Sequence, residues 1–253
     1  MLKLKDVTIK FGGLTAVNQV NAEISKGSIF GLIGPNGAGK TTLFNIISGV
    51  YAPTSGSVIF NGKEIQGTAP YKVNQMGISR TYQNINLFKK MSVLENVKVG
   101  CHSISDSGLL DSVLRTKSQR AEEKAIEEKS LEILNFMELG DKANYKASNL
   151  SYGEQRRLEI SRAWASDPEL ILLDEPAAGM NGKEKEELTE TIRKINEKGI
   201  TVLLVEHDMK LVMNVTDTIC VLNYGKKIAL GEPAYIQSNP AVIEAYLGGE
   251  ING

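Results

Sequence analysis

The chain has 253 residues, of which 42% are hydrophobic and 23% charged, as is usual for a soluble globular protein. Its 29 Lys and Arg residues nearly balance its 30 Asp and Glu residues, which excludes an overall basic field for holding nucleic acid. Cys101 and Cys220 lack the spacing of a zinc site or a disulfide framework, so we expect reduced thiols in a cytosolic compartment. The N-terminus does not have the apolar stretch of a signal peptide, and apolar runs such as 199–207 are far shorter than the roughly 18 residues of a membrane span.

The N-terminal part of the chain alternates apolar and polar residues as half-buried strands do. Residues 2–11 and 20–25 show this alternation at period two. Residues 57–65 place the pair Asn61-Gly62 between two short extended runs, which predicts a hairpin. We therefore expect antiparallel sheet in this part of the chain.

Two stretches predict parallel strands joined to helices. Residues 27–34 form a nearly continuous apolar run that leads through glycines into a predicted helix at 40–49. Further along, the predicted strands 169–176 and 200–207 flank a predicted helix at 183–199. The apolar residues on one face of that helix are Leu188, Ile192 and Ile195. The order strand, helix, strand indicates a βαβ unit in a parallel sheet.

The middle and the end of the chain have different patterns. The segment from about Val93 to Ala165 is mostly helical in its pattern, most clearly at 118–139, with Gly140 as the expected stop. Residues 218–232 predict a last hairpin that turns at Tyr224-Gly225.

The segment GPNGAGKT, residues 34–41, fits the P-loop pattern G-x-x-x-x-G-K-[ST] between a predicted strand and a predicted helix. Its glycines let backbone N–H groups turn toward phosphates, and the following helix adds its positive dipole end. Lys40 can reach the β- and γ-phosphates, and the Thr41 hydroxyl can ligate Mg²⁺. The alternative is a glycine-rich turn with an incidental lysine. The predicted nucleotide-binding residues of this loop are Gly34, Pro35, Asn36, Gly37, Ala38, Gly39, Lys40, Thr41 and Thr42.

An acidic pair follows the second apolar strand. Asp174 ends the run LILLD and is expected at the carboxyl edge of the sheet, where ligands bind in α/β proteins. Behind a P-loop, Asp174 would hold Mg²⁺ and Glu175 would accept a proton from an attacking water. Taken alone, such a pair is more often the N-terminal cap of the next helix.

These elements predict an α/β fold: a P-loop NTPase core, mostly a parallel sheet flanked by helices, with an antiparallel β subdomain and a helical subdomain insertion. We expect a single domain over 1–253. Within it, residues 1–90 and 166–253 would form the core with the β subdomain, and about 91–165 the helical subdomain.

Five segments in this order resemble the motifs of ATP-binding cassette (ABC) ATPases. They are the P-loop, Gln83 in RTYQNINLF, LSYGEQRR at 150–157, ILLDEP at 171–176, and His207 at the end of TVLLVEH. The resemblance implies that Phe11 stacks on adenine, although a buried strand aromatic is the alternative. It implies that Gln83 touches the metal and the attacking water and senses the transport partner. It also implies that His207 contacts the γ-phosphate and holds Glu175, so that Glu175, His207 and Gln83 are catalytic and Thr41, Gln83 and Asp174 bind the metal.

LSYGEQ corresponds to the signature of that family, usually written LSGGQ. The resemblance implies that two cassettes pack head to tail and that Ser151, Gly153 and Glu154 close over the nucleotide on the partner's P-loop. A serine hydroxyl, a glycine N–H and a helix N-terminus together suit an anion. The simpler interpretation of this segment is a capping box between Ser151 and Glu154. The chain departs from the family pattern at Tyr152, Glu154 and Asn181, so the resemblance does not extend to the turnover rate or the details of dimer communication. The residues expected to contact phosphate are unchanged.

Three classes of cassette protein compete. A nucleic-acid maintenance ATPase needs a very long coiled coil between P-loop and signature, but only 108 residues separate Thr42 from Ser151. A soluble translation-type ATPase needs a second P-loop, which the sequence lacks. The cytosolic motor of a membrane transporter remains. The segment 84–97 would supply its docking groove, with Lys89 and Lys90 beside exposed apolar residues; an ordinary helix-packing face is the alternative. The apolar residues expected in that groove are Ile85, Leu87, Phe88 and Met91.

The sequences of several motifs, including DEPAAGMN and NPAVIEAYLG, are most similar to those of ATPases of branched-chain or hydrophobic amino acid importers. The ATPases of urea or amide importers and of the lipopolysaccharide exporter share parts of these motif sequences and remain alternatives. The resemblance implies ATP and Mg²⁺ as cofactors. It implies a second ABC ATPase subunit (the same chain or a paralogue), transmembrane permease subunits and a separate substrate-binding protein as partners, and no nucleic acid. The expected location is peripheral, on the cytoplasmic face of the cell membrane.

Overall fold

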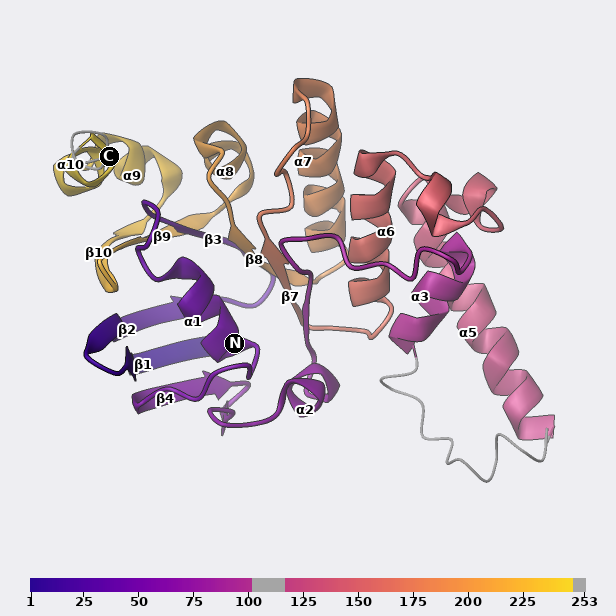
Figure 1. Cartoon of the computed structure of the whole chain (residues 1–253), viewed down its shortest axis with the longest axis horizontal. Coiled ribbons are helices and arrows are strands. Elements are labelled where there is room, and N and C mark those ends of the chain that lie inside the picture. Colours follow the sequence, from indigo (N-terminus) through magenta and orange to yellow (C-terminus); the bar gives the residue numbers. More distant parts are fainter. Residues whose placement is uncertain (102–116, 248–253) are drawn as a thin grey trace.

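The computed structural model describes residues 1–101 and 117–247, which form two β-sheets and the helices around them (Figure 1). The larger sheet has six strands in the order β10-β9-β3-β8-β7-β6 and the smaller four in the order β2-β1-β4-β5. Across the larger sheet the strands are β10 (Lys226–Gly231), β9 (Thr218–Asn223), β3 (Ile29–Ile33), β8 (Thr201–Val205), β7 (Leu170–Asp174) and β6 (Ile78–Arg80). The smaller sheet contains β2 (Leu14–Ile24), β1 (Leu2–Phe11), β4 (Ser55–Phe60) and β5 (Lys63–Glu64).

The described helices lie between residues 40 and 247. Figure 1 shows α3, α5 and α6 at the end of the molecule away from β1, β2 and β4. The helices, in chain order, are α1 (Lys40–Ile47), α2 (Pro70–Gln75), α3 (Val93–Cys101), α5 (Lys117–Phe136), α6 (Tyr152–Trp164), α7 (Gly182–Glu197), α8 (Met209–Val215), α9 (Pro233–Ser238) and α10 (Pro240–Leu247), with short 3₁₀ turns at Gly140–Lys142 and Ala147–Asn149. Among the described residues, none of these helices combines the length and apolarity needed to cross a bilayer.

The larger sheet is buried on both faces, which explains its continuous apolar strands. Every residue of β3, β7 and β8 is buried. In β8, Val202 and Leu204 pack in the cluster that includes α5, α6 and α7, whereas Leu203 and Val205 pack toward α1 and the smaller sheet. Strand β7, helix α7 and strand β8 form the predicted parallel βαβ unit. The fold class is therefore confirmed.

Both predicted hairpins are present. The turn between β4 and β5 has positive φ at Asn61 (48°) and Gly62 (81°), and the turn between β9 and β10 has it at Tyr224 (45°) and Gly225 (75°). Two consecutive left-handed residues give the twist that suits a two-residue hairpin. The smaller sheet is antiparallel throughout, as expected.

Two element ends differ from the prediction. Strand β2 begins at Leu14 rather than residue 20, because it pairs with β1 back to Phe11. Helix α5 ends at Phe136, before the expected stop at Gly140, because Glu138 adopts a left-handed φ of 58° and the Leu139 N–H returns to the Leu134 carbonyl, 2.8 Å away. This closure satisfies the last turn of a helix without a glycine.

The helical segment shares its core with the sheet. One buried cluster contains Leu134 of α5, Leu158 of α6, Ile171 of β7 and Ile192 of α7. This packing places α6 against the sheet that carries the acidic pair. The division into a core with a β subdomain and a helical subdomain at about 91–165 stays a prediction.

Candidate active site

The P-loop connects the end of β3 to the start of α1. Gly34 has a φ of 151°, and a Cβ there would lie 2.1 Å from the Leu222 carbonyl oxygen. Gly39 has a φ of 100°, and a Cβ there would lie 2.6 Å from the Ala16 carbonyl oxygen. Both positions therefore require glycine, which keeps the loop tight against its neighbours and its amides available for phosphate.

A pocket of about 400 Å³ lies over this loop. The predicted residues that line it are Asn36, Gly37, Ala38, Gly39, Lys40, Thr41, Thr42, Glu175 and His207. Sequence reasoning missed Leu14, Thr15 and Ala16 of β2 and the turn Tyr224-Gly225, which also line it. No motif marks these residues, because they reach the pocket only through the packing of the smaller sheet and the last hairpin.

Lys40 is held inside the loop. Its side chain is buried, and Nζ donates to the carbonyl oxygens of Gly34 (2.7 Å) and Pro35 (3.0 Å). Burial lowers the pKa of Lys40, while the nearby carboxylates of Glu175 and Asp174 act in the opposite direction. The ammonium is therefore fixed at the loop, where incoming phosphate oxygens can take the place of the carbonyls.

The three predicted catalytic side chains meet at one carboxylate. Gln83 Nε2 donates to Glu175 Oε2 at 2.9 Å, and His207 Nε2 hydrogen bonds to Glu175 Oε1 at 2.9 Å. Glu175 has a left-handed φ of 45°, and its N–H donates to the Val205 carbonyl at 2.9 Å. Such a backbone conformation is disfavoured for a non-glycine residue and is often found at functional sites. The structure thus brings Gln83, Glu175 and His207 together from three separate loops.

Asp174 is buried at the end of β7. Its Oδ2 lies 3.8 Å from Arg80 Nη2, and its N–H donates to Thr81 Oγ1 at 3.3 Å. Burial raises the pKa of Asp174, and the Arg80 guanidinium acts to lower it. The donor set predicted for the metal, the Thr41 hydroxyl, the Gln83 amide oxygen and the Asp174 carboxylate, consists of the hard oxygen atoms that Mg²⁺ prefers.

Glu206 is a second buried carboxylate, which sequence reasoning treated only as the end of a strand. Its side chain accepts the N–H of Ala177 at 2.6 Å and that of His207 at 3.0 Å. Burial raises the pKa of Glu206, and these backbone donors act to lower it. Glu206 therefore ties the loop that follows Glu175 to the loop that carries His207.

Phe11 is not a buried strand aromatic. Its side chain is 45% exposed and packs edge-to-face on Tyr51, with the ring centroids 5.4 Å apart. The residues just after its turn, Leu14 to Ala16, line the pocket. The role of Phe11 in stacking on adenine stays a prediction.

The signature segment begins helix α6 with the predicted capping box. The Glu154 N–H donates to Ser151 Oγ at 3.4 Å, and the Ser151 N–H donates to Glu154 Oε2 at 2.9 Å. Glu154 also forms an ion pair with Lys142, so both of its carboxylate oxygens are engaged. Ser151 is exposed, whereas Gly153 is buried against Glu184. The capping box is confirmed, and phosphate binding by Ser151, Gly153 and Glu154 stays a prediction.

The prediction of a docking groove in the segment 84–97 is partly wrong. Leu87 is buried in the main core cluster, and Ile85 packs against the same cluster. Phe88 is exposed, and the Arg162 guanidinium lies 5.7 Å from its ring centroid. The apolar periodicity of this segment therefore reflects partly inward packing, because Leu87 and Ile85 pack in the core cluster that also contains residues of α6.

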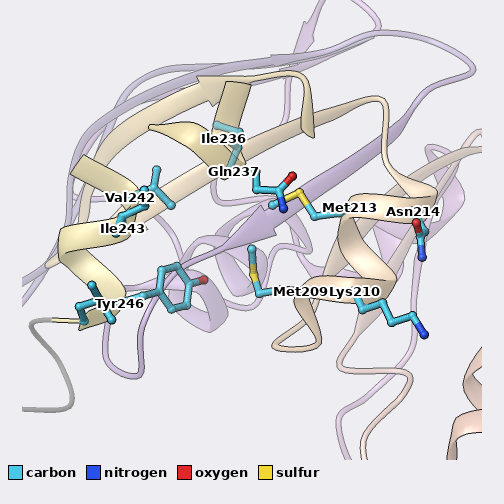
Figure 2. A pocket seen from close by; sticks show the side chains of 10 residues that line it. Met209, Lys210, Met213, Asn214, Ile236, Gln237, Val242, Ile243 and Tyr246 are labelled. Carbon is cyan, nitrogen blue, oxygen red and sulfur yellow. The ribbon is translucent and has the colours of Figure 1, made fainter. Parts of the chain in front are cut away.

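A second cavity of about 620 Å³ lies between α8, α9 and α10, with Met209, Met213 and Tyr246 among its lining residues (Figure 2). Burial raises the pKa of the Tyr246 phenol to about 12, and a hydrogen bond from the Gly34 backbone opposes this shift. The last described helix therefore contacts the first residue of the P-loop, which no pattern in the sequence indicated.

Asn181, where the family pattern has aspartate, begins helix α7. Its Oδ1 accepts the Glu184 N–H at 3.1 Å, and its own N–H donates to Glu184 Oε2 at 2.9 Å. We expect Asn181→Ala to lower the free energy of unfolding by about 1 kcal/mol, because this cap is lost. Urea titration monitored by circular dichroism measures the change. Asn181→Asp keeps a capping oxygen and is the control; equal stability of the Ala and Asp variants would contradict the role of the cap.

Comparison with known proteins gives consistent matches. A family model described as ABC transporter matches residues 17–178, and one described as Branched-chain amino acid ATP-binding cassette transporter matches residues 226–251. The chain is 45% identical to the high-affinity branched-chain amino acid transport ATP-binding protein LivG of Escherichia coli (strain K12), with 98% of each chain covered.

Solved structures agree. The ADP conformation of MJ1267, an ATP-binding cassette of an ABC transporter, matches with a TM-score of 0.86 and 34% identity, covering 98% of each chain. The dimeric post-hydrolysis state of the cassette MJ0796, bound to ADP and Pi, matches with a TM-score of 0.76 and 29% identity, over 92% of this chain and 99% of that one. The chain therefore belongs to the ABC transporter family, in its group of branched-chain amino acid transport ATP-binding proteins, and it is an ATPase subunit whose activity is coupled to transport.

Proposed function

We propose that this chain powers the uptake of branched-chain or other hydrophobic amino acids by hydrolysing ATP with Glu175 as the general base. The observation that carries the catalytic part is the pair of hydrogen bonds from Gln83 and His207 to the two oxygens of the Glu175 carboxylate, each 2.9 Å long. Two donors fix the direction of this carboxylate at the wall of the pocket. The proposed cargo is inferred from the similarity to branched-chain amino acid transport proteins.

In the proposed reaction, Glu175 accepts a proton from the water that attacks the γ-phosphorus. The bond from this phosphorus to the oxygen that bridges it to the β-phosphate breaks, which gives ADP and phosphate. Lys40 neutralises charge on the β- and γ-phosphates, and His207 contacts the γ-phosphate while it holds Glu175. The exposed side chain of Phe11 would stack on adenine.

Three residues would hold Mg²⁺. Gln83 uses its amide nitrogen toward Glu175, which leaves the amide oxygen for the metal, beside the Thr41 hydroxyl and the Asp174 carboxylate. When bound, Mg²⁺ neutralises the charge that develops on the phosphate oxygens. The chain's part is to place these donors at the start of α1, at the end of β7 and in the loop after β6.

Two cassettes, either two copies of this chain or this chain with a paralogue, would bind ATP between the P-loop of one and the signature of the other. Ser151 is exposed at the N-terminus of α6, where a helix favours an anion. The related cassette MJ0796 forms a dimer bound to ADP and Pi, which supports a dimer of cassettes. ATP that binds best to the closed dimer shifts the population toward closure, and hydrolysis reverses the shift.

The proposed partners are transmembrane permease subunits and a separate substrate-binding protein, with the cassette on the cytoplasmic face of the cell membrane. Phe88 is exposed and Met91 is half-buried, so these two apolar residues of the docking segment would remain available for a permease. The balanced charge of the chain does not favour nucleic acid as a partner.

Reconstitution tests the cargo. The chain is purified with its permease subunits and placed in liposomes with the binding protein. ATP hydrolysis is then assayed with leucine, isoleucine, valine, urea, a short amide, lipopolysaccharide or DNA, inside or outside the vesicle. We expect stimulation by the branched-chain amino acids on the side of the binding protein, and little by urea. Stimulation by urea or an amide alone would assign the related importer class, stimulation by lipopolysaccharide would assign the exporter class, and stimulation by DNA would exclude transport.

A further inference from the structure

Helix α6 carries a buried ion pair in the turns that follow the signature. Arg156 and Glu159 are 0% and 1% exposed, and Arg156 Nη1 lies 2.8 Å from Glu159 Oε2. A buried ion pair is weak evidence for stability, because the cost of removing both charges from water offsets most of their attraction. The contacts of this pair with other segments therefore indicate what it does.

The pair holds the backbone of the segment that contains Gln83. Arg156 donates to the carbonyl oxygens of Tyr82 (2.9 Å) and Gln83 (3.0 Å). Glu159 Oε1 accepts the N–H groups of Tyr82 and Asn86, both at 3.4 Å. The segment 82–86 is therefore bonded to α6 through both its carbonyls and its amides, over a sequence separation of 73 to 77 residues.

Two proposed nucleotide contacts lie at the ends of this connection. At one end Ser151 caps α6 and is exposed for the partner's nucleotide. At the other end the Gln83 side chain donates to the catalytic carboxylate of the same chain at 2.9 Å. Between them α6 is a continuous helix of 13 residues with a complete capping box, so a shift at its N-terminus carries Arg156 and Glu159 with it.

We propose that Arg156 and Glu159 couple the two ATP sites of the dimer: when the partner's γ-phosphate binds at Ser151, α6 moves, and the ion pair moves Gln83 relative to Glu175 of the same chain. The inference rests on the proposed function, because it needs both hydrolysis at Glu175 and a signature that serves the partner's nucleotide. It makes Arg156 and Glu159 positioning residues, which act through Gln83.

Arg156→Lys tests the coupling. A lysine keeps the charge opposite Glu159, but its single nitrogen cannot replace the guanidinium fork that reaches two carbonyls and a carboxylate. We expect ATP binding, measured with a fluorescent ATP analogue, to be unchanged. The Hill coefficient for hydrolysis, which can rise to about 2 for two coupled sites, should fall to about 1. The control is Arg157→Lys, the neighbouring, partly buried arginine, which pairs with Glu187 of α7 instead of the Gln83 segment and should keep the native Hill coefficient.

A second variant tests the same role if Arg156→Lys does not fold. Arg156→Met with Glu159→Gln removes both buried charges together, which is tolerated better than leaving one unpaired. It should fold, bind ATP and lose cooperativity in the same way. Hydrogen exchange gives a measurement without any change to the pair: in a Glu175→Gln protein, ATP should alter exchange of the Tyr82 and Asn86 amides, and adding Ser151→Ala should abolish that change.

The outcomes separate the two proposals. If the native protein does not hydrolyse ATP, the proposed function fails. If the native protein hydrolyses ATP cooperatively and the variants of the pair keep the native Hill coefficient, only the coupling role is overturned. The same holds if ATP changes exchange of the Tyr82 and Asn86 amides equally with and without Ser151→Ala. Native hydrolysis without cooperativity would also overturn the coupling role while leaving Glu175 as the base.

Discussion

Glu175→Gln is expected to lower the rate of ATP hydrolysis by about two to four orders of magnitude, the usual contribution of a general base. The amide has the same shape as the carboxylate, so the neighbouring Gln83 and His207 stay close, but it cannot take a proton from water at neutral pH. ATP binding at the P-loop does not involve this proton and should be retained. Because hydrolysis no longer reopens the dimer, ATP should hold two chains together.

Two measurements check this prediction. Phosphate release gives the rate, and size-exclusion chromatography with ATP and Mg²⁺ gives the oligomeric state. The control is Glu169→Gln, at the opposite end of β7, where the carboxylate pairs with Lys26 on the surface. That variant should hydrolyse ATP at the native rate. Hydrolysis at the native rate by Glu175→Gln would remove Glu175 as the base, and loss of nucleotide binding would assign it a binding role instead.

Lys40→Ala is expected to weaken ATP binding by about 10- to 100-fold. A hydrogen bond between charged groups contributes about 1.5–3 kcal/mol, and each 1.4 kcal/mol changes an affinity tenfold. The lysine is already buried at the loop with its ammonium on the Gly34 and Pro35 carbonyls, so little further ordering opposes its contact with phosphate. Its removal therefore takes away a preorganised cation rather than a mobile surface charge.

Isothermal titration calorimetry with ATP and Mg²⁺ measures this affinity. Lys26→Ala serves as the control, because Lys26 is an exposed lysine in a surface ion pair. We expect it to bind ATP as the native chain does. Unchanged affinity in Lys40→Ala, with native circular dichroism, would contradict the role of Lys40 in phosphate binding.

Local patterns in the sequence predicted the elements that hold the site. The spacing of Gly34, Gly39 and Lys40 marked the phosphate loop, because a tight turn between strand and helix needs those residues within a few positions. Buried parallel strands are apolar on both faces, so β7 and β8 stood out, and the Asn61-Gly62 and Tyr224-Gly225 turns marked the hairpins. The capping box of Ser151 and Glu154 was also predicted, since both residues lie in one helical turn.

Contacts between distant segments could not be predicted from such patterns. Leu87 was expected on the surface, because a short apolar run does not reveal which of its residues face the core. Glu206 looked like the end of a strand, and only the packing of two loops shows that it accepts the N–H groups of Ala177 and His207. Arg156 in the signature helix likewise carried no local signal for its contact with Gln83.

The sequence by itself determined that the chain has a phosphate loop, an acidic pair at the end of a buried strand and a capped signature helix, because each of these depends on residues a few positions apart. The tertiary structure decided that Gln83 and His207 share the carboxylate of Glu175, across 92 and 32 residues of chain, and that α6 holds the Gln83 segment through a buried ion pair. These contacts arise where strands β6, β7 and β8 end at one edge of the sheet, and strand order is set by packing of the whole chain rather than by any short stretch of it.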